Sequence, residues 1–226
     1  VKDTVYVAPG VGKNVLALDA VTGEVRREYK NTATTVELIC SNGVVFPMVE
    51  PDRKMVDYRQ EHPNCWHERD RASEKWAWRK ESKQRLMAIE ANTGKTKWAV
   101  KSPIATMTLA VDNKKACFFD GESVVAVDRD TGKVLWESET LEEMGRLKTG
   151  YGGPKLLLHG QYVLLSPQKK IYALKANTGE VVWSVSGKPR SGHHSPEDLF
   201  VINDIVWAAG TARGRKTRLN RLLKEN

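Results

Sequence analysis

Residues 126–136 read AVDRDTGKVLW, and this stretch decides the fold because its pattern recurs three more times. Every copy begins with alanine and has Thr-Gly at its sixth and seventh positions. The other copies are residues 17–27 (ALDAVTGEVRR), 88–98 (AIEANTGKTKW) and 173–183 (ALKANTGEVVW). Three copies end in tryptophan, whereas the first has Arg27 at that place. Such recurrence indicates a repeat protein, in which each repeat is one supersecondary unit that packs against its neighbours.

Each copy predicts a β-hairpin. A short apolar strand runs into a polar turn that ends in Thr-Gly, and a second strand rich in β-branched and aromatic residues follows. Glycine at the last turn position supplies the positive φ that a short hairpin loop with a bulge needs. Because four copies share this pattern, the sequence predicts an all-β protein.

The pattern resembles the tryptophan-docking motif of the PQQ-like repeats, which are found in the quinoprotein-like β-propellers. The resemblance implies four-stranded antiparallel blades, with the motif on the third and fourth strands of each. It also implies that each tryptophan stacks between the alanine of its own motif and the Thr-Gly peptide of the next. The residues expected to dock the blades are Ala88, Trp98, Ala126, Thr131, Gly132, Trp136, Ala173, Thr178, Gly179 and Trp183.

The intervening sequence supplies the other strands of each blade. The expected segments are 4–8, 36–40 with 43–49, 104–111 with 116–119, 155–159 with 162–166, and 199–202 with 205–209. Residues 1–210 therefore represent about four to five blades of a partial ring, and we expect a piece of a longer chain. Trp183 has no following Thr-Gly turn, so we expect it to dock near Thr22-Gly23. That turn belongs either to the same chain, which would close a four-bladed ring, or to a second copy.

Residues 50–84 interrupt the second blade with a charged insertion. Strong helix formers without Pro or Gly predict one surface helix over residues 67–83. Trp66, Trp76 and Trp78 lie in this insertion. Two interpretations stay open: the helix folds back and buries its tryptophans on the blade edges, or it binds a partner.

Two polar clusters are candidate sites. His62, Cys65 and His67 are residue types that bind zinc, but no second pair at structural-site spacing follows them. His193 and His194 begin a polar loop before the last pair of strands. This loop either forms a binding patch or only has the polar residues that are common in loops. No positioned acid or oxyanion donor makes that loop a catalytic triad.

Composition and charge limit the kinds of partner that the chain can bind. The formal net charge is +8, and residues 211–226 hold six Lys or Arg against one Glu. Such a tail either contacts nucleic acid or an anionic surface, or is a solvated end. No apolar run approaches the ~18–20 residues that span a bilayer. Three cysteines, none adjacent in sequence, leave the redox compartment open.

The leading functional prediction is a non-catalytic propeller scaffold for protein–protein interaction, within a larger multidomain bacterial protein. The resemblance favours a periplasmic or cell-envelope location, and the partner is another protein, flanking domains or a second copy of the chain. A dehydrogenase that holds pyrroloquinoline quinone and calcium is the first alternative. It is disfavoured because the family's enzymes use two adjacent cysteines, which this chain lacks. Nucleic-acid binding through the basic tail is the second alternative.

Overall fold

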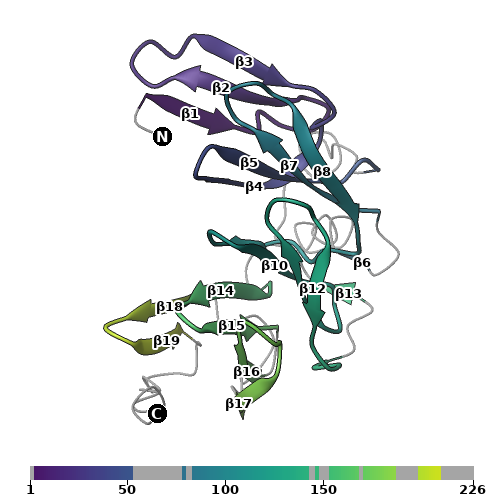
Figure 1. The fold of residues 1–226 in the computed structure, drawn as a ribbon, viewed down its shortest axis with the longest axis vertical. Helices are drawn as coiled ribbons and strands as arrows, with labels where there is room; N and C mark the ends of the chain where they lie inside the picture. The colour runs from purple at the N-terminus through teal and green to yellow at the C-terminus, as the bar shows by residue number, and fades with distance from the viewer. Residues whose placement is uncertain are drawn as a thin grey trace, which may run out of the picture.

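The computed structural model describes residues 3–52, 78–79, 83–142, 146–147, 153–167, 170–186 and 198–209. These residues contain strands and turns and no helix, so the prediction of an all-β fold is confirmed. The strands form antiparallel blades arranged along an open arc, with the first blade at one end and β18 and β19 at the other (Figure 1).

The first blade has three strands and the next three have four each. The first contains β1 (Thr4–Val7), β2 (Val15–Asp19) and β3 (Val25–Tyr29), and the second contains β4 (Thr35–Ser41), β5 (Val44–Val49), β7 (Arg85–Glu90) and β8 (Thr96–Lys101). The third contains β9 (Ala110–Val111), β10 (Lys115–Phe119), β11 (Val124–Asp128) and β12 (Val134–Glu137), and the fourth contains β14 (Lys155–His159), β15 (Tyr162–Ser166), β16 (Lys170–Lys175) and β17 (Val181–Ser186). A final hairpin pairs β18 (Asp198–Ile202) with β19 (Ile205–Ala209).

The core is divided among the gaps between successive blades. One apolar cluster fills each gap, and the central two contain fully buried side chains such as Phe46, Phe118 and Phe119. A third cluster joins the first two blades, and a fourth joins the fourth blade to the final hairpin. The second, third and fourth blades therefore bury apolar side chains on both faces of their sheets, as expected of stacked repeats.

Successive inner strands lie next to one another, since β9 contacts both β4 and β14, and β14 contacts β18. These strands surround the axis of the arc. Because neighbouring strands are antiparallel, the Thr-Gly turns lie at the same end of the blades as the turns that follow the inner strands. Val49 and Arg85, between which the insertion runs, pair with each other at the opposite end of the second blade, and the links between blades begin at that end.

One strand prediction needs correction. The expected strand over residues 104–111 is only Ala110–Val111. Its earlier part is irregular because Met107 has a φ of 69° and the hydroxyl of Thr108 donates a hydrogen bond to the carbonyl of Ala105 (2.6 Å). The segment still bonds to β10 outside the regular ladder, because the N–H of Ala105 donates to the carbonyl of Phe119 (2.8 Å) and the N–H of Phe119 donates to the hydroxyl of Thr108 (3.1 Å).

The predicted helix over residues 67–83 is wrong at Trp78–Arg79, which form the short strand β6. This strand pairs with β13 (Arg146–Leu147), in the link between the third and fourth blades. Pairing with a segment distant in sequence outweighs the local helix propensity at these two residues. The rest of the expected helix, apart from Lys83, lies outside the described residues.

Candidate functional site

The four Thr-Gly turns have one shared geometry. The motif glycines Gly23, Gly94, Gly132 and Gly179 have φ between 71° and 76°. In each repeat the glycine N–H donates to the carbonyl four residues earlier, at distances of 2.8–2.9 Å. A register shift follows the motif alanine in all four copies. The repeats therefore place the last strand of each blade in an equivalent position.

The threonine and the acidic residue of the motif have separate roles in this turn. The hydroxyl oxygen of Thr131 accepts a hydrogen bond from the N–H of Lys133 (3.4 Å), and the other three copies make the same bond. The carboxylate of Asp128 accepts hydrogen bonds from the N–H groups of Asp130 and Thr131. At the equivalent Asp19, such bonds from Thr22 and Val21 lower the pKa to about 2. The carboxylate thus stays ionised and caps the turn at neutral pH.

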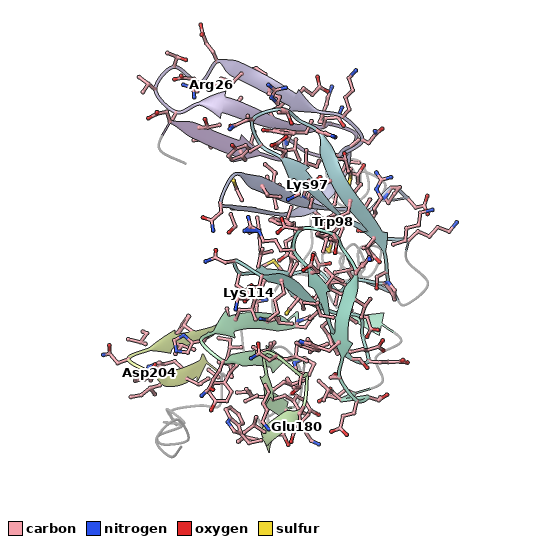
Figure 2. The ribbon with its side chains drawn as sticks, viewed as in Figure 1. Arg26, Lys97, Trp98, Lys114, Glu180 and Asp204 are labelled. Carbon is pink, nitrogen blue, oxygen red and sulfur yellow. The ribbon has the colours of Figure 1, made fainter. Side chains whose placement is uncertain are left out.

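Trp98 and Trp136 contact the turn of the following blade. Trp98 lies across from Ala88, and its indole N–H donates to the carbonyl of Arg129 (2.8 Å; Figure 2). A Cβ added to Gly132 would lie 2.8 Å from Cδ2 of Trp98, so only glycine leaves room for the ring.

The next pair repeats this arrangement. Trp136 lies across from Ala126, and its indole N–H donates to the carbonyl of Ala176 (3.1 Å). A Cβ on Gly179 would lie 2.5 Å from Cε3 of the ring. Arg129 and Ala176 occupy the same motif position, so the same carbonyl receives the indole in both places.

In the first blade two residues together make the contacts of the absent tryptophan. The side chain of Arg27 lies over Gly94, with its Cδ 3.5 Å from where a Cβ would be, and its guanidinium donates to the carbonyls of Asn92 and Thr93. The hydroxyl of Tyr29 donates to the carbonyl of Ala91 (2.7 Å), which is the carbonyl that receives the indole elsewhere. Sequence reasoning recorded Arg27 only as an exception and did not identify Tyr29.

Trp183 does not reach the first blade. It lies across from Ala173 and packs at the edge of the cluster that contains Leu199 and Val206 of the final hairpin. A Cβ on Gly23 would meet nothing within 4 Å. The expectation that Trp183 docks on Thr22-Gly23 of the same chain is therefore wrong, because the arc is open.

Polar side chains link the inner turns at the Thr-Gly end. The amide of Asn42 in the second blade bonds to the side chain of Asn113 in the third. The guanidinium of Arg129 donates to the carbonyl of Ser41 (2.6 Å). At the last gap, the ring of His159 lies 3.1 Å from the carboxylate of Asp204, which Figure 2 labels.

A half-buried acid lies at the opposite end of the axis. The carboxylate of Glu37, on β4, accepts hydrogen bonds from the N–H groups of Met107 (2.8 Å) and Leu109 (3.2 Å). Burial raises the pKa of Glu37 to about 7, although these two bonds and the charge of Lys155 act in the other direction. The side chain of Met107 is 49% exposed. Glu37 thus holds a loop that presents an apolar side chain to solvent.

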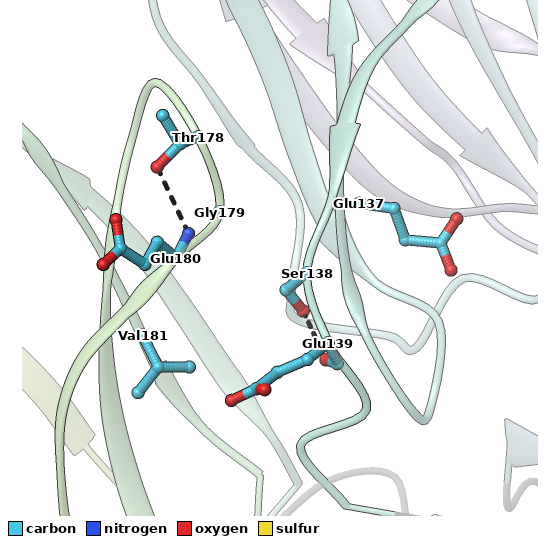
Figure 3. A pocket seen from close by; sticks show the side chains of 7 residues that line it. All are labelled: Glu137, Ser138, Glu139, Thr178, Gly179, Glu180 and Val181. Carbon is cyan, nitrogen blue, oxygen red and sulfur yellow. Dashed lines mark hydrogen bonds between the residues drawn. The ribbon is translucent and has the colours of Figure 1, made fainter.

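A shallow pocket of about 330 Å³ lies between the third and fourth blades at their outer edge. Figure 3 shows its lining residues, which are Glu137, Ser138, Glu139, Thr178, Gly179, Glu180 and Val181. Thr178 and Ser138 use their hydroxyl groups in local hydrogen bonds, to the N–H of Glu180 and the carbonyl of Glu139. The pocket follows from the packing of Trp136 on the next turn.

Several expected site residues lie outside the described part of the chain. These are the metal candidates His62, Cys65 and His67, the loop residues His193 and His194, and the tryptophans Trp66 and Trp76. Trp78 is described only as part of β6. Within the described ranges, no group of three or more His, Cys, Asp or Glu is placed to hold a metal ion.

The arrangement of stacked PQQ-like blades agrees with comparisons to known proteins. A family model described as outer membrane protein assembly factor BamB (PQQ_2) matches residues 1–146 and 120–221. The chain belongs to this family of PQQ-like β-propellers. A curated relative, outer membrane protein assembly factor BamB of Burkholderia pseudomallei, is 26% identical over 155 residues, which are 62% of this chain and 40% of that protein.

Solved structures share the fold. The crystal structure of BamB from Moraxella catarrhalis has a TM-score of 0.59 and 15% identity, over 93% of this chain and 54% of that one. Quinohemoprotein alcohol dehydrogenase ADHIIG from Pseudomonas putida HK5 has a TM-score of 0.53 and 16% identity, over 91% of this chain and 37% of that one. The chain thus spans about half or less of the length of these proteins.

The described residues do not fit the quinone site of the dehydrogenases. Trp98 and Trp136 use their ring faces and N–H groups in contacts with the next blade. Cys40 and Cys117 are free thiols on different blades, and no two of the three cysteines are adjacent in sequence. We therefore derive no chemistry through pyrroloquinoline quinone.

Proposed function

We propose that this chain is a non-catalytic β-propeller scaffold that binds another protein in the bacterial cell envelope. The proposal rests on what the motif residues contact. Trp98, Trp136 and the Arg27–Tyr29 pair all contact the following blade, so the repeats stack blades rather than surround a ligand. Membership of a family described by an outer membrane assembly factor supports the envelope location. In the described part of the chain, no helix has the length and hydropathy needed to cross a membrane.

The partner binds, in our proposal, at the end of the axis where the insertion emerges. Met107 offers an exposed, flexible thioether side chain of the kind found at protein-binding surfaces. Its backbone has a φ of 69°, which is unfavourable for a side chain with a Cβ. The hydrogen bonds from Met107 and Leu109 to Glu37 hold this conformation, so the loop is presented in one shape. Preorganisation of this kind lowers the entropic cost of binding.

Photo-crosslinking tests this proposal. A photoreactive phenylalanine analogue replaces Met107 in one variant and Val134 in a control, because Val134 is 60% exposed on an outer strand away from the axis. Both variants are expressed in the native bacterium, irradiated and analysed by mass spectrometry. We expect one defined protein adduct from position 107 and none from position 134. Identical adducts at both positions, or none at either, would contradict the proposal.

A Glu37→Ala variant with the crosslinker at position 107 adds a structural control. Loss of the carboxylate removes both hydrogen bonds that hold the loop. We expect the adduct to decrease several-fold while circular dichroism still shows folded blades. An unchanged adduct would show that the loop shape does not contribute to binding.

A further inference from the structure

Met107 is the most exposed methionine in the described part of the chain. It is 49% exposed, whereas Met48 and Met87 are 0% and 3% exposed within the apolar clusters that join the first three blades. This exposure arises in the middle of the chain, because the link that contains Met107 joins β8 to β9 and both flanking blades are described. Met55 and Met144 lie outside the described residues. A peroxide oxidises a thioether only where it reaches the sulfur atom, so Met107 should react first of the three described methionines.

The thioether is the exposed tip of a segment whose other side chains are largely covered. Thr106 is half-buried. The residues of this segment that are at most 5% exposed are Ile104, Ala105, Thr108 and Leu109. A partner that contacts the loop from solvent therefore meets mainly the side chain of Met107.

The backbone of the loop is held independently of that side chain. The N–H groups of Met107 and Leu109 donate to the carboxylate of Glu37 at 2.8 and 3.2 Å. The hydroxyl of Thr108 donates to the carbonyl of Ala105. None of these bonds uses the sulfur atom. A chemical change at the sulfur therefore leaves the loop in place and alters only the surface that the loop presents.

We propose that Met107 is a reversible oxidation site, at which a peroxide converts the thioether to a sulfoxide and weakens the binding of the partner. This inference rests on the proposed function, which places the partner on the same loop. A lone pair of the sulfur attacks one oxygen of hydrogen peroxide, the O–O bond breaks, an S–O bond forms and the other oxygen leaves as water. The sulfur loses two electrons and the peroxide gains them. Methionine sulfoxide reductases reverse the change, with two thiols that supply the electrons and become a disulfide while the oxygen leaves as water.

The sulfoxide opposes binding because it is polar and a thioether is not. Oxidation turns a flexible apolar side chain into a polar, chiral one. A partner that packs on the thioether would then cover an S–O group, and covering a polar group without a hydrogen bond is unfavourable. We expect the affinity for the partner to fall at least about tenfold.

The burial of Met48 and Met87 distinguishes this change from oxidative damage. A sulfoxide at either position would place a polar group inside an apolar cluster between blades. Both sulfur atoms are shielded as long as the blades stay packed. Brief oxidation should therefore modify Met107 while the fold is retained.

Peptide mass spectrometry of the purified chain tests the chemistry without any partner. The chain is incubated with hydrogen peroxide, and the gain of one oxygen is followed over time in the peptides that contain Met107, Met48 and Met87. We expect Met107 to be oxidised at least about tenfold faster than the other two, with an unchanged circular dichroism spectrum. Equal rates at the three positions, or loss of the folded spectrum as Met107 reacts, would overturn the proposal.

Photo-crosslinking tests the effect on binding. A photoreactive phenylalanine analogue replaces Thr106, which leaves Met107 in place, and cells of the native bacterium are irradiated with and without brief exposure to hydrogen peroxide. We expect the adduct to decrease several-fold as Met107 is oxidised and to return after the peroxide is removed. Met107→Leu is the matched control, because it keeps an apolar side chain without a sulfur, and its adduct should resist peroxide. Met107→Gln places a permanent polar group there and should reduce the adduct without peroxide.

The outcomes separate this inference from the proposed function. An adduct that persists while most of Met107 is oxidised, or that decreases equally in Met107→Leu, would contradict the oxidation site and leave the binding surface standing. No adduct in untreated cells would contradict the proposed function, and with it the effect of oxidation on binding.

Discussion

Replacing the four motif glycines by alanine, one at a time, separates the cost of the turn from the cost of the contact between blades. Gly23, Gly94, Gly132 and Gly179 occupy the same turn with nearly the same φ. They differ in what a new Cβ would meet: nothing at Gly23, the flexible Arg27 side chain at 3.5 Å at Gly94, and a tryptophan ring at 2.8 Å or less at the other two. Gly23→Ala is therefore the matched control for the whole series.

The expected losses follow from two terms. Alanine at positive φ costs roughly 1–2 kcal/mol, and this term applies to all four variants. At Gly132 and Gly179 the Cβ also intrudes on the ring, well inside the ~3.5–4.0 Å of an ordinary carbon contact. The rings cannot move freely without weakening the bonds from their indole N–H groups to the next blade. Such overpacking costs about 1–3 kcal/mol more.

Urea unfolding followed by far-ultraviolet circular dichroism measures the loss for each variant. Repeat proteins can unfold blade by blade, so hydrogen exchange read by peptide mass spectrometry should accompany it. We expect Gly132→Ala to increase exchange in the strands on both sides of its gap, β8 and β11. Gly23→Ala should affect only the first blade.

Equal losses for all four variants would refute the reasoning. They would mean that only backbone strain matters and that the tryptophans contribute little to the contact between blades. A loss at Gly94 as large as that at Gly132 would show instead that Arg27 is held as rigidly as an indole.

Three further predictions concern Glu37, Tyr29 and Cys117. The raised pKa of Glu37 means that its proton stabilises the fold below pH 4.5, and this contribution is lost as the pH rises through about 7. Relative to the wild type, the free energy of unfolding of Glu37→Gln should therefore rise by about 1–2 kcal/mol between pH 5 and pH 8, after allowance for partial exposure. Urea titrations in which this difference does not rise with pH would contradict the prediction. Tyr29→Phe leaves the carbonyl of Ala91 without its hydroxyl partner and should cost about 1–2 kcal/mol by urea unfolding, whereas an unchanged midpoint would remove Tyr29 from the contact. Burial raises the pKa of the Cys117 thiol to about 12, so iodoacetamide at pH 8 should modify it only in urea, and rapid modification of the folded chain would show that β10 opens.

The fold class was predictable because the repeated signals are local. Each motif contains its own turn glycine, its capping Asp or Glu in three of four copies, and an apolar strand, so a window of eleven residues specifies a hairpin. The asparagines of the inner turns are equally local, and Asn42 and Asn203 have the positive φ that two-residue hairpins need. Features that depend on residues distant in sequence were harder to predict.

Glu37 shows why part of the candidate site was missed. In the sequence it is a single acid within a strand, with no nearby feature to distinguish it. Burial raises its pKa, and the link at residues 105–109 folds over β4 so that the N–H groups of Met107 and Leu109 reach its carboxylate and partly offset this effect. The pairing of β6 with β13 has the same origin, since the two strands are separated by 66 residues of sequence. No pattern within one window of sequence contains this information.

The first blade shows that the contact of the motif tryptophan consists of two separable parts. An indole covers the next glycine with its ring and reaches a carbonyl three residues before that glycine with its N–H. In the first blade the stem of Arg27 covers Gly94, and the hydroxyl of Tyr29, two residues further along the same strand and on the same face, reaches Ala91. The guanidinium adds two hydrogen bonds to backbone carbonyls that an indole does not make. Arg-x-Tyr is thus a physical substitute for the tryptophan, and a search that requires tryptophan at the last motif position would overlook blades of this kind.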